Sequence, residues 1–386
     1  MQIVIFSPHD DPIMGVTLDG YLRGNKAGGK YSYLPKLLIN KHSKDNEIYI
    51  LRRHHSSLRY KAKDLLRLLF WCFYNKINFF NLRIISDIGQ VCDSGIFFAS
   101  ARRSMMDAPL SELAKKVNTL KVFHMTHFAL KINKVSENIK SVGGHLLVSE
   151  ANLLKTSGIF LKYYSGCAEE NICILPFVPE ERFKKTKPFN RRKNIACVFG
   201  SLNVFDGTQG YLSEFFRFYN VNTYHPMRKI IYENREAIRD CIDSFITLVS
   251  ASGKTSPKNA NKYYKSFDIV EHLNEYRMAI APEEIIGVPA IGFVEAMACG
   301  CAYIGRESPM YSDVGLISGV NYIGYDGTLC DLIEKIRYYQ KHSAELKLIA
   351  DAGVLYVNEN FSPHVVVDRF VMKLRSSINA NLNSIK

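Results

Sequence analysis

The chain has 386 residues, of which 47% are apolar, and its formal net charge is +13. This length is too great for one ordinary hydrophobic core and fits two domains of roughly 150 to 200 residues. The composition excludes a disordered or fibrous chain, and the positive charge calls for an acidic partner such as nucleic acid, anionic lipid or a diphosphate-bearing substrate.

Residues 2–8 are predicted to form a strand that starts directly after Met1, without the basic n-region or cleavage site of a signal peptide. No apolar run approaches the ~20 residues that cross a membrane. The nine cysteines stand in no framework spacing, which favours a reducing cytoplasm. Cys299 and Cys301 could form a metal or redox pair, but no partner Cys or His lies near them in the sequence.

Short apolar runs alternate with helical patterns through the first half of the chain. After the first strand come a loop rich in Gly and Asp and a helix over 31–40. Further strands are predicted at 47–51, 82–88, 95–99, 122–128 and 145–149. The apolar stretch 172–179 closes this half. Such alternation is typical of parallel, doubly wound sheets.

A charged segment rich in Lys and Arg, 181–193, is predicted to be a linker, after which the pattern restarts. Strands are predicted at 194–200, 244–249, 278–281 and 302–305, and helices at 210–219, 227–239, 293–298, 329–341 and 344–360. The sequence therefore predicts an α/β fold with two Rossmann-like, doubly wound domains, 1–180 and 194–360. Ligands in such folds bind at the carboxyl ends of the strands, so we expect a central cleft.

The segment 59–76 combines leucines and aromatic residues with Arg and Lys, and it contains the only tryptophan of the chain, Trp71. A basic helix of this kind is a candidate for lying at an anionic membrane surface, where Trp is a common anchor. A surface helix packed on its own sheet explains the pattern equally well, because the apolar residues nearly surround the helix.

Residues 283–305 read as an acidic loop broken by Gly and Pro, a short helix of small residues, a turn at Gly300 and a buried strand. The N-terminus of a helix offers unpaired N–H groups and a positive dipole end to a phosphate. The carboxylates of Glu284 and Glu295 suit the hydroxyls of a ribose or a sugar. Together these features predict a nucleotide-sugar site.

The run Glu-Ala-Met-Ala-Cys-Gly at 295–300 resembles the signature of GT-B glycosyltransferases, especially the large retaining E-x7-E family (glycosyl transferases group 1). Further matches follow in the order that family uses. They are Gly28-Gly29 with the leucines after them, Thr126-His127, Ile174-Leu175-Pro176, and Glu359-Asn360-Phe361-Ser362 before a last helix, 361–386, that would cross back to the first domain.

By this resemblance, Glu295 would hold the ribose of a nucleotide, and a second glutamate would bind the donor sugar and face its reacting carbon. Eight residues before Glu295 stands Gly287, which cannot do this. Matching the local E-x-x-G-x-P pattern gives Glu284 instead, with three extra residues in the loop. Glu283 remains an alternative.

The resemblance also implies an Arg and a Lys for the diphosphate, shortly after the strand that ends at Gly200. Neither cation stands in the turn 200–208. A leaving diphosphate needs its charge neutralised, and the candidate cations are Arg228, Lys229 and Arg306. For each of them a surface salt bridge is the alternative role.

In the first domain, His127 would contact the donor sugar or stabilise charge near the reacting carbon, with His124 as the second choice. Gly28 and Gly29 would let the backbone approach donor or acceptor closely. Asp10 and Asp11 follow the first strand, where an inverting enzyme would need a general base. No DxD-type motif stands out, so we expect no essential metal and no cofactor besides the nucleotide-sugar substrate.

The sequence is thus expected to encode a cytoplasmic glycosyltransferase. It would move a hexose from a nucleotide-diphosphate sugar to a glycan or lipid-linked acceptor, by retention, in bacterial O-antigen, lipopolysaccharide or capsule synthesis. A nucleotide-sugar epimerase of the same fold and a non-catalytic protein that binds membranes or polyanions are the alternatives. Nucleic acid is not expected as a partner, because the basic residues are dispersed and no binding motif is present.

Overall fold

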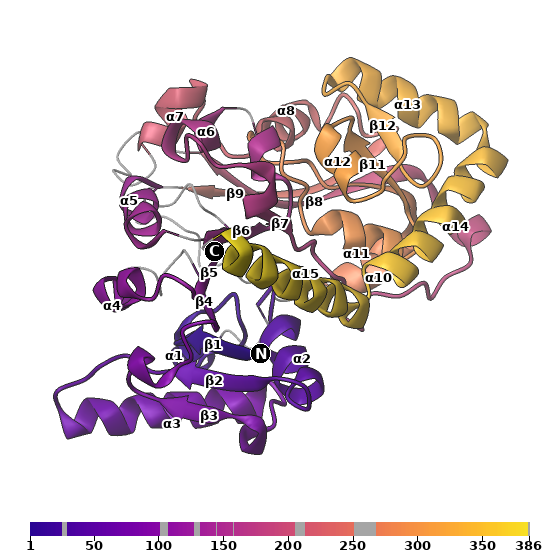
Figure 1. The fold of residues 1–386 in the computed structure, drawn as a ribbon. Helices are drawn as coiled ribbons and strands as arrows, with labels where there is room; N and C mark the ends of the chain where they lie inside the picture. Colours follow the sequence, from indigo (N-terminus) through magenta and orange to yellow (C-terminus); the bar gives the residue numbers. More distant parts are fainter. Residues whose placement is uncertain are drawn as a thin grey trace. The chain divides into compact units, whose positions relative to one another are not determined.

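A computed structural model describes residues 1–24, 29–100, 107–126, 132–143, 145–156, 158–204, 213–250 and 268–384. The chain divides into two compact units, shown as ribbons in Figure 1. Unit 1 comprises Met1–Glu150, Leu161–Leu175 and Pro363–Lys386, and unit 2 comprises Ala151–Phe160 and Pro176–Ser362. Each unit is built around one parallel sheet.

The sheet of unit 1 has seven parallel strands in the order β3-β2-β1-β4-β5-β6-β7. Its strands are β1 (Gln2–Phe6), β2 (Glu47–Leu51), β3 (Arg83–Ile85), β4 (Ile96–Ser100), β5 (Leu120–His124), β6 (His145–Ser149) and β7 (Ile172–Ile174). The order reverses at β1, as in doubly wound folds. β5 ends at His124, earlier than the strand predicted at 122–128, so Thr126 lies beyond the strand.

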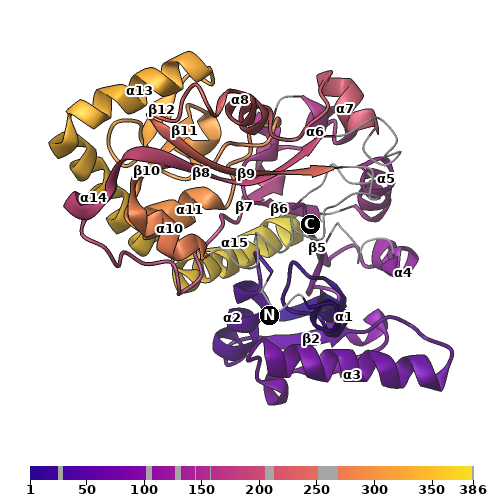
Figure 2. The same ribbon diagram turned by 180° about the vertical axis from the view of Figure 1, so that it is seen from behind.

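The helices of unit 1 cover this sheet. They are α1 (Leu18–Leu22), α2 (Tyr33–His42), α3 (Leu58–Tyr74), α4 (Leu110–Lys115), α5 (Ile132–Val142) and α15 (Pro363–Ser384), and α6 (Ile159–Tyr163) begins in unit 2. α15 lies beside α2 in Figures 1 and 2, where Lys41 and Asp368 form an ion pair of 2.7 Å. The last helix therefore packs with α2 and β5, elements of unit 1 that are far from it in the sequence.

Unit 2 contains a parallel sheet of five strands in the order β12-β11-β10-β8-β9. Its strands are β8 (Lys193–Val204), β9 (Ile242–Ser250), β10 (Tyr276–Ile280), β11 (Ala302–Arg306) and β12 (Ile323–Tyr325). Its helices are α7 (Ser213–Tyr219), α8 (Pro226–Asn234), α10 (Ile269–Glu275), α11 (Gly292–Ala298), α12 (Pro309–Asp313), α13 (Leu329–Lys341) and α14 (Ser343–Asn360). α8 ends five residues before the predicted end of the helix at 227–239.

The segment 181–193 lies within unit 2, where Phe183 and Phe189 are buried. Arg192 is also buried, and its guanidinium donates to the Cys299 carbonyl (2.8 Å) and to Asn274 Oδ1 (2.9 Å). A cation suits this place, because the carbonyls at the C-terminal end of a helix, here α11, carry partial negative charge.

Within the described ranges, every helix falls short of the length and apolar character that crossing a bilayer requires. All nine cysteines are free thiols. Burial raises the pKa of Cys299 and Cys301 to about 12, so both thiols stay protonated and buried at neutral pH. They are packing residues rather than a reactive pair.

Candidate functional site

The carboxyl ends of three neighbouring strands of unit 2 carry most of the candidate residues. β8, β10 and β11 are adjacent and parallel, with Ile280 opposite Val198 and opposite Ile304. The residues that follow them, Gly200 in β8, the loop 281–291 after β10, and Arg306 at the end of β11, therefore meet at one edge of the sheet. Ligands of open parallel sheets bind at this edge.

Gly200 and Arg228 are in direct contact at this edge. A Cβ on Gly200 would stand 2.7 Å from Cζ and Nη1 of Arg228, and the φ of Gly200 is +147°, which side chains rarely adopt. The guanidinium donates from Nη1 to the Ser201 carbonyl at 3.1 Å. Glycine at position 200 thus makes room for the arginine, which is one of the predicted replacement cations.

The start of α8 is fastened to the acidic loop. The backbone N–H of Ile285 donates to the Tyr224 carbonyl at 2.7 Å, and His225 Nδ1 lies 3.4 Å from the Glu283 carbonyl oxygen. Arg228, on the first turn of α8, is therefore held next to the segment 283–285. Lys229 pairs with Glu233 one turn later, at 3.9 Å, so it takes part in a surface pair along the helix.

Glu283 points into unit 2 and is buried. Its Oε1 accepts hydrogen bonds from the Tyr311 hydroxyl (2.5 Å) and the Arg306 backbone N–H (2.8 Å), and the Tyr303 and Tyr311 hydroxyls are 2.5 Å apart. Burial raises the pKa of Glu283, although these hydrogen bonds oppose the shift. Glu283 therefore joins the loop to the end of β11, and the next residue, Glu284, is half-buried.

Glu295 lies in the first turn of α11 and is half-buried. The helix starts close against β10, because a Cβ on Gly292 would come within 2.8 Å of the Ala281 Cβ. α11 has only seven residues, so its dipole is weak. Arg306 is exposed and lies across Gly327, where an added Cβ would be 2.8 Å from its Nε.

The structure describes only some of the candidate site residues of unit 1. His127 and Gly28 lie outside the described residues. Gly29 packs against the backbone of the loop after β1, since a Cβ there would stand 2.0 Å from the Pro12 carbonyl oxygen. The packing of the backbone in this loop therefore requires glycine at position 29, whether or not a ligand binds there. His124 is fully buried and its ring meets that of Tyr31 edge-on at 4.3 Å.

One carboxylate at the strand ends of unit 1, that of Glu150, was not predicted from the sequence. Glu150 directly follows β6, and its Oε2 accepts hydrogen bonds from Thr126 Oγ1 (3.0 Å) and Ser149 Oγ (3.1 Å). These contacts place it at the carboxyl ends of β5 and β6. The signal that could have found it is its position as the acidic residue after the predicted strand at 145–149.

Asp10 and Asp11 differ in their surroundings. Asp11 is buried, and its Oδ1 accepts from the Ile13 N–H at 2.9 Å, which closes a turn of the backbone. Asp10 lies between the guanidinium groups of Arg53 and Arg67.

The fold has solved counterparts. HepE of Anabaena, in complex with UDP-glucose, is similar over 97% of this chain and 100% of its own, with a TM-score of 0.55 and 12% identity. The sucrose-phosphate synthase of Thermosynechococcus elongatus is similar over 98% of this chain and 100% of its own, with a TM-score of 0.50 and 11% identity. The fold is GT-B. No family model and no curated protein sequence matches the chain.

Proposed function

We propose that this chain is a glycosyltransferase that moves a hexose from a nucleotide-diphosphate sugar to a hydroxyl of a glycan or lipid-linked acceptor. The observation that carries the proposal is the convergence, in a GT-B fold, of Arg228 over Gly200 with the acidic loop and the end of β11. Cations and carboxylates at one sheet edge suit a ligand with both a diphosphate and hydroxyls.

In this proposal each residue has a distinct task. Arg228 and Arg306 neutralise the charge that grows on the leaving nucleoside diphosphate, in place of the cations missing from the turn 200–208. Glu295 accepts hydrogen bonds from the ribose, and Glu284 from the transferred sugar. Lys229 contributes less positive charge to the ligand, because its ammonium group pairs with Glu233 at the surface and is screened by solvent. We propose that His127 acts from unit 1 and that no metal is essential.

The finer assignments rest on the sequence resemblance. Transfer by retention follows from the E-x7-E family to which the 295–300 signature is similar, as does a role in bacterial O-antigen, lipopolysaccharide or capsule synthesis. An epimerase of the same fold is the second candidate, and it would convert the donor sugar without any acceptor.

Nucleotide titrations test the proposal. We expect calorimetry with UDP, GDP and their hexose conjugates to show that the protein binds the nucleotides of one of the two bases. Arg228→Gln should lower the affinity for that nucleotide about tenfold or more, since a charge-assisted hydrogen bond is removed. Arg235→Gln is the matched control, because Arg235 lies near the end of the same helix and stacks on Tyr232 at 4.5 Å. Absence of binding to every donor, with the fold intact, contradicts the proposal.

We also propose that the chain works at the inner face of the cytoplasmic membrane, through the outer face of α3. Side chains spaced three, four or seven residues apart on this helix form an exposed apolar stripe of Leu58, Leu65, Leu66, Leu69 and Phe73. Exposed Arg59, Lys61 and Lys63 flank it, and the one acidic residue of the segment, Asp64, is buried. Basic residues beside an apolar stripe suit an anionic bilayer.

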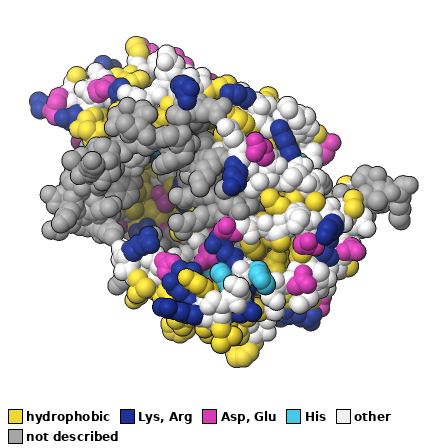
Figure 3. Space-filling view, turned by 90° about the vertical axis from the view of Figure 1, so that its left-hand side faces the viewer, with side chains coloured by type: hydrophobic (Ala, Val, Ile, Leu, Met, Phe, Trp, Pro, Cys, Tyr) yellow, Lys and Arg dark blue, Asp and Glu magenta, His cyan; other side chains and the backbone are white. Residues whose placement is uncertain are grey.

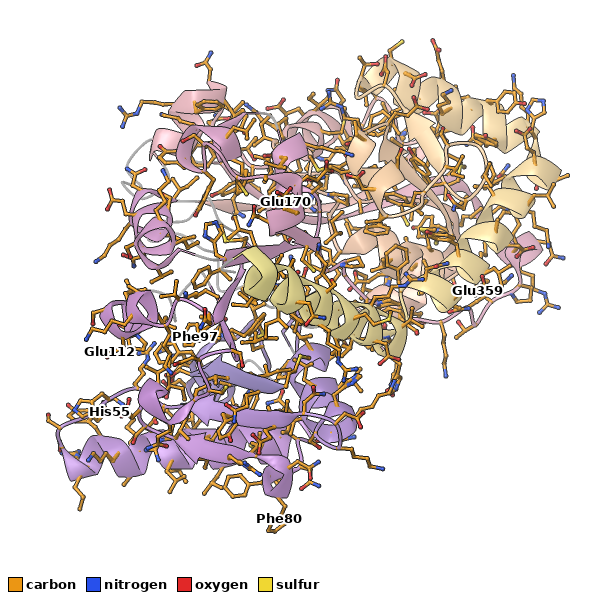
Figure 4. All side chains as sticks on the ribbon, viewed as in Figure 1. His55, Phe80, Phe97, Glu112, Glu170 and Glu359 are labelled. Atoms are coloured by element: carbon orange, nitrogen blue, oxygen red, sulfur yellow. The ribbon has the colours of Figure 1, made fainter. Side chains whose placement is uncertain are left out.

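The surroundings of α3 agree with this assignment. In Figure 3, hydrophobic and basic side chains lie next to each other in the lower part of the face, the side on which α3 begins in Figure 1. Figure 4 shows Phe80, a few residues past α3, pointing away from unit 1, whereas Phe97 points into it; their exposed fractions are 94% and 0%. Large exposed apolar patches mark binding surfaces.

A further inference from the structure

Two tyrosine hydroxyls meet the buried carboxylate of Glu283 inside unit 2. The Tyr311 hydroxyl donates to Glu283 Oε1 at 2.5 Å, and the Tyr303 hydroxyl lies 2.5 Å from that of Tyr311. The Tyr303 hydroxyl also donates to the Ala281 carbonyl at 3.2 Å. All three side chains are buried. They therefore form one hydrogen-bonded chain behind the sheet edge rather than part of a surface that a ligand touches.

This chain joins separate elements of unit 2. Tyr303 is in β11, Tyr311 is in α12, and Glu283 is in the loop after β10. The rings of the two tyrosines pack on Phe293, in the first turn of α11, with centroid distances of 5.9 and 6.0 Å. One cluster thus connects the loop, the strand and the helix that carry the candidate ligand-binding side chains.

Glu283 takes the place of a strand partner for Arg306. β10 ends at Ile280, whereas its neighbour β11 continues to Arg306, two residues past Ile304, which is opposite Ile280. The Arg306 N–H therefore faces no residue of β10, and it donates instead to Glu283 Oε1 at 2.8 Å. The backbone position of Arg306 thus depends on where a side chain of the acidic loop is held.

The backbone of β11 makes room for the Tyr303 ring at Gly305. A Cβ added to Gly305 would stand 2.7 Å from Cε1 of Tyr303 and 2.9 Å from its hydroxyl oxygen. Any larger residue at position 305 would displace the ring, and with it the hydroxyl that meets Tyr311.

A packing role alone does not explain the two hydroxyls. In the same cluster, Phe293 and Phe361 pack edge-on at 5.7 Å with plain rings. Phenylalanine at positions 303 and 311 and an apolar residue at 283 would avoid the cost of burying a carboxylate, and such replacements are often neutral or stabilising. A buried polar network that is hydrogen-bonded instead fixes one arrangement of the segments that it joins.

We infer that Tyr311 and Tyr303 are positioning residues for the nucleotide-diphosphate site, acting through Glu283 on the backbone of Arg306. This inference rests on the proposed function and deepens it, since it says what holds Arg306 against the diphosphate. Without the Tyr311 hydroxyl, Glu283 Oε1 loses its shortest hydrogen bond, and the carboxylate is free to turn away from the Arg306 N–H. The guanidinium then leaves its place beside the leaving diphosphate.

A double-mutant cycle measured by calorimetry tests the inference, with UDP or GDP as the ligand, whichever the wild type binds. We expect Tyr311→Phe to lower the affinity for the diphosphate about tenfold, since a hydrogen bond to a charged group is lost. In an Arg306→Gln background the same substitution should change the affinity less than about twofold, because the side chain through which Tyr311 acts is already absent.

The nucleoside alone gives a readout that a purely structural role would not produce. Uridine and guanosine lack the phosphates that Arg306 would contact, so their affinity, measured by saturation-transfer NMR, should be the same for Tyr311→Phe and the wild type. An effect confined to the diphosphate separates positioning of Arg306 from a general loosening of unit 2.

Tyr276→Phe is the matched control. The Tyr276 hydroxyl is buried and donates to the Asp243 carboxylate at 2.7 Å, but Tyr276 begins β10 and so lies at the opposite edge of the same sheet. This variant should lose as much thermal stability as Tyr311→Phe and keep the wild-type nucleotide affinity. If Tyr311→Phe does not fold, Tyr303→Phe takes its place in the cycle, with an expected loss of about fivefold.

Three results overturn the inference. They are wild-type affinity for the diphosphate in Tyr311→Phe, an equal loss for the diphosphate and the nucleoside, and an undiminished loss in the Arg306→Gln background. Each of them leaves nucleotide binding by the wild type intact. A wild type that binds neither UDP nor GDP refutes the proposed function itself, and the inference falls with it, so the two failures are distinguishable.

Discussion

The guanidinium of Arg228 occupies the space that a side chain on Gly200 would need, with Cζ 2.7 Å from the position of a Cβ. Gly200→Ala is therefore expected to displace Arg228 and to lower nucleotide affinity about tenfold, in addition to the strain of a positive φ. Calorimetry with the preferred nucleotide measures the affinity. Gly319→Ala is the control, because Gly319 has a φ of +75° with nothing within 4 Å of an added Cβ. It should lose stability without losing affinity, and the same affinity in both variants contradicts the role of Arg228.

Substitutions at the two neighbouring glutamates of the acidic loop should affect different properties, stability for Glu283 and turnover for Glu284. Glu283→Ala leaves the Tyr311 hydroxyl and the Arg306 N–H without their acceptor, so we expect the free energy of unfolding to fall by about 2 to 4 kcal/mol. Glu284→Gln should melt within a few degrees of the wild type and transfer sugar about 100-fold more slowly. Thermal melting and initial rates measure the two effects. An unchanged rate for Glu284→Gln would show that another carboxylate faces the sugar.

Most strands were predictable from the sequence because they contain short buried apolar runs, and 145–149 matches β6 residue for residue. β12, of only three residues, was not predicted. The partners of site residues were not predictable, since they are distant along the chain. Arg228 lies 28 positions after Gly200, and Asp64 lies 55 after His9. Only tertiary packing brings such pairs together, so the sequence could name Gly200 and Arg228 without showing that they touch.

Helix α3 shows another limit of sequence patterns. Its apolar residues nearly surround it because two separate faces are apolar. One face contains Leu68, Trp71 and Cys72, which are buried against the rest of unit 1. The other face is the exposed stripe. The expectation that Trp71 anchors the helix in a membrane is wrong: its side chain is fully buried, and Nε1 donates to the Met14 carbonyl at 3.3 Å. Periodicity reveals an apolar face, but not what covers it.

Low pH should destabilise the packing of α3 on the rest of unit 1, because it protonates the Asp64 carboxylate. Burial alone would raise the pKa of this carboxyl, but the hydrogen bonds and charges of His9 and Arg52 outweigh it and lower the pKa to about 2. A carboxyl titrates near 3.9 in an unfolded chain, so the shift contributes about 2.5 kcal/mol of stability. Because the folded pKa is the lower one, this contribution is complete above pH ~4 and is lost as the pH falls through 2.

Urea unfolding of the wild type and Asp64→Asn at several pH values measures this contribution. The difference in unfolding free energy between the two proteins should be largest above pH 5 and should shrink by about 2 kcal/mol near pH 2. Asp19→Asn serves as the control, since its carboxylate is 48% exposed and its pair with Arg67 contributes little. A difference that does not vary with pH would mean that Asp64 acts through packing alone.

The exposed stripe of α3 should control binding to anionic vesicles. We expect Leu66→Ser combined with Phe73→Ser, whose native side chains are 59% and 84% exposed, to lower partitioning onto phosphatidylglycerol vesicles at least about tenfold in sedimentation assays. Binding should also weaken with added salt and be slight on phosphatidylcholine, because the flanking Arg and Lys contribute about 1 kcal/mol each. The matched control is Leu348→Ser with Leu355→Ser on α14, exposed by 71% and 59% but outside the stripe. Equal losses in the two double variants would show that the stripe has no special part in membrane binding.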